Sequence, residues 1–122
     1  FYQREDEIQF MKQHGVLPEA WAPLTGGVRT DIFRNEVLSS IASKYGKTVA
    51  QVILRWLHQR GIVSIPKTVR RERMIENISI FDFQLSEEDM KLISSLDTGR
   101  SLYFSHRDPE VVRRLCSFKI PT

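Results

Sequence analysis

The chain has 122 residues, which suits one small domain or a part of a larger one. Hydrophobic residues make up 41% of it and charged residues 27%, as in a typical globular protein, and no apolar run is long enough to cross a bilayer. The net charge of +3 is too small to indicate nucleic acid as a partner, and the single cysteine, Cys116, excludes an internal disulfide. We therefore expect a cytoplasmic protein with no membrane partner.

Two helices and one short strand are predicted in the first third of the chain. The helices cover residues 4–14 and 35–45, where apolar side chains recur every three or four positions and a glycine follows. Between them, the apolar run 16–24 contains Pro18 and Pro23, so a strand there must be brief. A Thr-Gly-Gly loop at 25–27 follows this strand.

The clearest element is a helix between Thr48 and Gly61. Gln51 follows Thr48 by three residues, which is the spacing of a capping box, in which each side chain bonds the other residue's backbone N–H. The apolar positions that follow recur at helical spacing and indicate a buried stripe: Val49, Val52, Ile53, Trp56 and Leu57.

The second half begins with a β-branched strand at 62–65, which Pro66 ends. A helix is predicted over 69–77, an extended connector at 81–83, and a further helix over 86–96 that Ser86 caps. Beyond residue 98 only a helical turn at 111–115 is expected.

Strands separated by helices predict parallel pairing, with the helices outside the sheet. Two parallel strands cannot form a buried sheet alone, because each needs covered neighbours. The expected fold class is therefore α/β, with two consecutive strand-helix units of a larger α/β barrel. Either the rest of the barrel or a second copy would cover the exposed strand edges.

Charge is distributed oppositely at the starts of the last two predicted helices. The helix after Ser86 opens with acidic residues, which suit the positive end of a helix dipole. The helix after Thr68 opens with cations instead: Lys67, Arg70, Arg71 and Arg73. This pattern favours an anion site at the helix start. The alternative is that these arginines extend into solvent, with Glu72 and Glu76 as partial neutralisers.

A DNA-reading helix is disfavoured there, because the basic stretch is short and Met74, Ile75 and Ile78 are expected to use the remaining face for packing. Neither a GxGxxG loop nor a Walker lysine motif is present to explain a phosphate site by other means. In barrel enzymes, phosphate is often bound after strands seven and eight.

Residues 64–77 (SIPKTVRRERMIEN) resemble the segment of aldo-keto reductases that binds the 2′-phosphate of NADPH. Further segments also resemble that family: 1–3, 21–24, 48–61, 80–86 and, as in diketogluconate-reductase-like members, 105–110. The resemblance implies that Lys67, Thr68 and Arg73 would hold the 2′-phosphate. Val69 and Arg70 would frame the same pocket, and NADPH would be preferred over NADH. The resemblance also implies a partial (β/α)8 barrel, in which residues 1–122 are the C-terminal portion of one domain: strand-helix units 7 and 8 with a preceding helix and a C-terminal tail.

The resemblance assigns the remaining nucleotide contacts to two other places. Glu76 and Asn77 would hydrogen-bond the adenine. Trp21 would stack on the nicotinamide, although a tryptophan in a strand is more often part of a core. Leu24 and Gly26 would lie against the pyrophosphate, where the preceding position carries threonine in place of the glycine that many relatives have.

The family's chemistry is hydride transfer from NADPH to a small carbonyl substrate, with a tyrosine acid supported by lysine, aspartate and histidine. The resemblance puts all four upstream of Phe1, which is itself not a methionine, so a natural start upstream is expected. The chain alone should therefore be inactive, while the full-length protein reduces aldehydes or ketones to alcohols. The alternative is a non-catalytic subunit that binds the nucleotide as a sensor or structural ligand.

Overall fold

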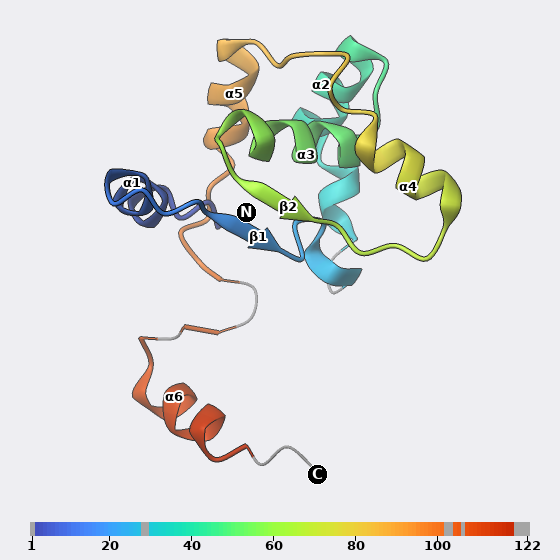
Figure 1. Cartoon of the computed structure of the whole chain (residues 1–122). Helices are drawn as coiled ribbons and strands as arrows, with labels where there is room; N and C mark the ends of the chain where they lie inside the picture. Colours follow the sequence, from blue (N-terminus) through green and yellow to red (C-terminus); the bar gives the residue numbers. More distant parts are fainter. Residues whose placement is uncertain (1, 28–29, 102–103, 106, 119–122) are drawn as a thin grey trace.

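The computed structural model describes residues 2–27, 30–101, 104–105 and 107–118. Its elements, in chain order, are α1 (Glu5–Gln13), β1 (Glu19–Trp21), the 3-10 turns η1 (Thr25–Gly27) and η2 (Asp31–Arg34), α2 (Glu36–Tyr45), α3 (Val49–Gln59), β2 (Val63–Ile65), α4 (Arg71–Ile78), α5 (Glu87–Ser94) and α6 (Pro109–Cys116). Helices α2 to α5 gather around the two strands, and α6 lies apart from them (Figure 1). Within the described ranges, no helix has the length and apolar character that crossing a membrane requires.

The two strands pair in parallel, as the order of elements predicts. Glu19 lies opposite Val63 and Trp21 lies opposite Ile65, and the Val63 N–H extends the ladder by donating to the Pro18 carbonyl at 3.0 Å. The α2–α3 hairpin forms the crossover between the strands, which parallel pairing requires.

The core lies between this strand pair and helices α2, α3 and α5. Its fully buried side chains come from α2 and α3: Leu38, Val52 and Leu54. Ile93 of α5 closes the core from another side, with 2% of its surface exposed. The predicted capping box of α3 is present, since the Thr48 N–H bonds the Gln51 side chain and the Gln51 N–H bonds the Thr48 hydroxyl.

The structure corrects the prediction for α4. This helix begins at Arg71, two residues later than expected, because Thr68 accepts the Arg70 N–H in a local turn and Arg70 becomes the N-cap. Its apolar side chains do not pack as expected: Met74 is 52% exposed and Ile78 is 69% exposed. In the part of the chain that the structure describes, α4 has no buried residue, because its main neighbour is α3 on one side.

The predicted helical turn near the C-terminus is longer than expected. Asp108 caps α6 by accepting the Glu110 N–H at 2.9 Å, and Pro109 occupies the first helical turn. These two signals start the helix two residues before the predicted turn.

Candidate functional site

The carboxyl ends of β1 and β2 bring two predicted site segments to the same edge of the sheet. Because the strands are parallel and Trp21 lies opposite Ile65, the chain leaves both strands at that edge. The segment after β1 carries Leu24 and Gly26, and the segment after β2 carries Lys67. Both arrowheads point the same way in Figure 1, toward η2 and the loop that leads into α4.

The segment after β1 is a tight, left-handed turn. Trp21 is 70% exposed, while Leu24 packs partly against the core. The Thr25 N–H donates to the Ala22 carbonyl at 2.9 Å, and Ala22, Thr25 and Gly26 have φ of 47°, 66° and 57°. Glycine adopts such angles freely, whereas a β-branched threonine does so at a cost. Thr25 is nevertheless buried, whereas Gly26 next to it is exposed.

The segment after β2 presents cations around an uncapped helix start. Lys67 and Val69 are exposed and Thr68 is half-buried. Arg70 occupies the N-cap of α4 and makes no side-chain cap, so no side chain of this cap satisfies the first amides of the helix. Amide donors and cations thus occur together, which is the arrangement that binds phosphate at helix starts.

The cations of this segment have no acidic partner among the described residues. No ion pair there involves Lys67, Arg70, Arg71 or Arg73, although the chain forms ion pairs elsewhere. Glu72 and Glu76 are the acids that could neutralise these arginines. Neither forms an ion pair with these arginines within the described ranges, and Oε1 of Glu76 accepts from the Thr48 hydroxyl at 2.5 Å.

Glu76 and Asn77 lie in the C-terminal half of α4, and both are half-buried. The Gln51 side chain donates to the Glu76 carbonyl at 3.1 Å and to the Ser79 carbonyl at 2.9 Å. The far end of α4 is therefore attached to the start of α3, while its other end carries the cations.

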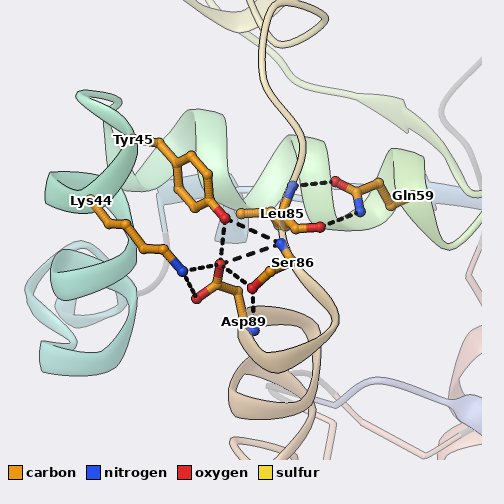
Figure 2. Close-up of polar contacts among 6 residues, drawn as sticks. All are labelled: Lys44, Tyr45, Gln59, Leu85, Ser86 and Asp89. Atoms are coloured by element: carbon orange, nitrogen blue, oxygen red, sulfur yellow. Dashed lines mark hydrogen bonds and ion pairs between the residues drawn. The ribbon is translucent and has the colours of Figure 1, made fainter.

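A second polar cluster, which the sequence did not reveal, lies where α2 meets α5 (Figure 2). Asp89 is 3% exposed and accepts from the Tyr45 hydroxyl at 2.5 Å, from the Lys44 ammonium at 2.9 Å and from the Ser86 hydroxyl at 2.8 Å. Burial opposes the charge, but the hydrogen bonds from Tyr45, Lys44 and Ser86 outweigh it and lower the pKa of Asp89 to about 2.

This cluster joins a tyrosine, a lysine and an aspartate, but its donors are all directed at the Asp89 carboxylate. It lies at the α2–α5 junction and not at the carboxyl edge of the strands (Figure 1). We therefore assign it a role in fixing α5 on α2. Lys44 and Asp89 are 45 residues apart in the sequence, so no local sequence pattern indicates the contact.

Comparison with known proteins identifies the family. The aldo/keto reductase family model matches residues 2–98. Aldose reductase B of Dictyostelium discoideum is 53% identical over 90 residues, which are 74% of this chain and 29% of that protein.

Solved structures agree. An aldo-keto reductase from a Medee basin deep-sea metagenome superposes with a TM-score of 0.83 at 38% identity, over 88% of this chain and 39% of its own. An aldo-keto reductase complexed with NADPH (AKR2E5) superposes with a TM-score of 0.74 at 38% identity, over 82% and 33%. The chain spans about a third of the length of these relatives. By sequence and by fold, it belongs to the aldo/keto reductase family.

Proposed function

We propose that this chain forms the cofactor-binding part of an NADPH-dependent reductase that converts small aldehydes or ketones to alcohols. The observation that carries the proposal is the group of cations around the uncapped start of α4, which have no ion-pair partner among the described residues. A doubly charged phosphate would reverse the unfavourable interaction between these cations and the positive helix end. NADPH, when bound, supplies the hydride.

Three side chains fit the 2′-phosphate of adenosine. Arg73 offers a planar, permanently charged donor set, and Lys67 adds a flexible ammonium. The Thr68 hydroxyl, which accepts the Arg70 N–H, keeps its own proton for donation to an oxygen of the phosphate. Val69 and Arg70 would frame this pocket, since both are exposed between the strand and the helix.

The other end of the nucleotide would lie along the segment after β1. The exposed ring of Trp21 would stack on the nicotinamide and leave one face of it open to substrate. Leu24 and Gly26 would lie against the pyrophosphate, where the absence of a side chain at Gly26 permits close approach of the backbone. Glu76 and Asn77 would bond the adenine.

We further propose that residues 1–122 form the C-terminal portion of one barrel domain, with β1 and β2 as its seventh and eighth strands. Val63 and Ile65 are 41% and 54% exposed on the strand face opposite the helices, which is unusual for β-branched strand residues. The other strands of the same barrel would cover this face, because the helices lie outside a barrel. The proton donor would belong to that other part, so the chain alone would not reduce a carbonyl.

The proposal is tested by removing the two principal cations in the full-length protein. Lys67→Ala with Arg73→Ala should weaken NADP⁺ binding at least about 100-fold, because two charge-assisted hydrogen bonds are lost. NAD⁺, which lacks the 2′-phosphate, should bind within about twofold of its wild-type affinity. Both dissociation constants are measured by titration calorimetry.

Lys91→Ala is the control, since it removes an exposed cation of α5 that lies outside the proposed site. A change of less than about twofold in the NADP⁺ dissociation constant of the double variant would contradict the proposal. Reduction of an aldehyde by the full-length protein then separates a reductase from a nucleotide-binding subunit without turnover.

A further inference from the structure

Helix α4 is attached to the rest of the chain mainly by polar contacts. Within the described ranges none of its residues is buried, and its main neighbour is α3. Apolar packing therefore contributes little to fixing its position there. Four hydrogen bonds from α3 and its cap reach α4 and the two residues that follow it; the donors are Thr48, Gln51 and Arg55.

The Gln51 side chain makes three hydrogen bonds with its two polar atoms. Its Oε1 accepts the Thr48 N–H at 3.0 Å, which completes the capping box of α3. Its Nε2 donates to the carbonyls of Glu76, at 3.1 Å, and Ser79, at 2.9 Å. The residue is only 7% exposed, so water cannot take the place of these bonds, and a lost bond would leave a buried polar group unsatisfied. One buried amide thus caps the start of α3 and binds the end of α4.

A comparison within the chain shows why an amide is needed here. The second capping box pairs Ser86 with Asp89, a carboxylate, whose other partners are the donors Lys44 and Tyr45. An acid would serve the α3 box equally well, since glutamate is a standard partner at that position. The carbonyls of α4 need donors instead, which a carboxylate lacks and glutamine has.

Thr48 adds a contact to the Glu76 side chain on α4. Its hydroxyl accepts the Gln51 N–H at 3.3 Å and donates to Glu76 Oε1 at 2.5 Å. In the described part of the chain Glu76 Oε2 has no hydrogen-bond partner. One carboxylate oxygen is therefore held, and the other is oriented and left as an acceptor.

We infer that Gln51 and Thr48 are positioning residues of the nucleotide site: they hold the end of α4 so that Glu76 presents one oxygen to the 6-amino group of adenine. The inference rests on the proposed function, because it concerns the same nucleotide. It adds that base selection depends on the cap of a neighbouring helix. Phosphate selection depends on the opposite end of α4, so the two can be measured separately.

The test uses the full-length protein and two nucleotides, NADP⁺ and its hypoxanthine analogue, in which a carbonyl replaces the 6-amino group. Gln51→Glu keeps the capping box but removes both donors to α4. We expect it to weaken NADP⁺ binding about tenfold, which corresponds to about 1.4 kcal/mol, and to bind the analogue nearly as well as wild type does. The preference for adenine should thus fall about tenfold.

Asp89→Asn is the matched control, because it makes the reverse exchange of acid and amide in the other capping box. It should lower the melting temperature without changing the adenine preference. If Gln51→Glu does not fold, Thr48→Val removes the hydroxyl that both holds Glu76 and caps α3, and Thr48→Ser keeps that hydroxyl. We expect the valine variant to lose most of the adenine preference and the serine variant to keep it.

Two results would overturn the inference: an adenine preference within about twofold of wild type in both Gln51→Glu and Thr48→Val, or an equal loss in Asp89→Asn. Failure of the proposed function would look different. Wild-type protein would then not bind NADP⁺, or the variant lacking Lys67 and Arg73 would bind it normally.

Discussion

Asp89 shows how a single buried charge can be made favourable. Burial alone would raise its pKa, yet three donors on α2 and α5 surround the carboxylate and lower it to about 2 (Figure 2). Tyr45 is half-buried: its ring packs against Phe83 and the core, and its hydroxyl bonds Asp89.

The depressed pKa makes the stability of the chain depend on pH. The charged form of Asp89 is favoured by folding, so its contribution is complete above about pH 4 and is lost as pH falls toward 2. We expect Asp89→Asn to reduce the free energy of unfolding by about 2 kcal/mol at pH 7. It should also flatten the pH dependence between about pH 4 and pH 2, as followed by urea denaturation.

Glu19→Gln provides a comparison for this measurement, because Glu19 is an exposed acid in β1. It should leave the slope between pH 4 and pH 2 largely unchanged. An equally steep acid loss in the Asp89 variant and in wild type would show that this carboxylate does not govern the acid transition.

At the scale of elements, local sequence predicted the start of a helix correctly where residues adjacent in the sequence cap that helix. The Thr48–Gln51 spacing predicted the capping box of α3, and Ser86 predicted the start of α5. The signal failed at α4, where Thr68 competes for the backbone and delays the helix. Local sequence also could not show that Gln51 reaches α4, because that contact spans 25 to 28 residues.

The C-terminus of α2 offers a test of one such local signal. Gly46 has φ of 62°, and the Lys47 N–H donates to the Ala42 carbonyl at 2.9 Å, which is a Schellman motif. A Cβ at Gly46 would meet no atom within 4 Å, so the cost of Gly46→Ala is conformational and not steric. We expect a loss of about 1 kcal/mol in the free energy of unfolding, measured by urea denaturation.

Ser43→Ala is the matched control in the same helix. Ser43 is exposed, and its hydroxyl only bonds the Ser39 carbonyl one turn earlier. Its replacement should change the free energy of unfolding by less than about 0.5 kcal/mol. If both variants lost the same amount, the left-handed conformation at Gly46 would not be the cause.

At the scale of the whole molecule, the sequence predicted the parallel pairing but not which surfaces remain uncovered. Strand-helix alternation specifies the pairing, because a parallel connection needs a crossover. Which apolar residues are covered depends on contacts between distant segments. For this reason Met74 and Ile78 were expected to pack, whereas they are exposed in the described structure. The residues predicted to form the site after β1 and β2 share one edge, as the parallel register requires.

The exposed strand face leads to a prediction about the 122-residue chain when it is produced alone. Val63, Ile65 and Trp21 expose apolar surface, and each strand has a single partner within the described ranges. Such surfaces and edges favour association. We expect sedimentation velocity to show a mass that rises with concentration, and Ile65→Lys to shift the chain toward monomer.

Val112→Lys is the control for this last experiment, since Val112 is 41% exposed on α6, away from the strands. A charge there should leave association unchanged. Dissociation by Ile65→Lys alone would locate the contact on the strand face, which is the face that the remainder of a barrel would cover in the full-length protein. A monomer at all concentrations would mean that two strands and their helices suffice without such cover, and the exposed β-branched residues would then not indicate a larger barrel.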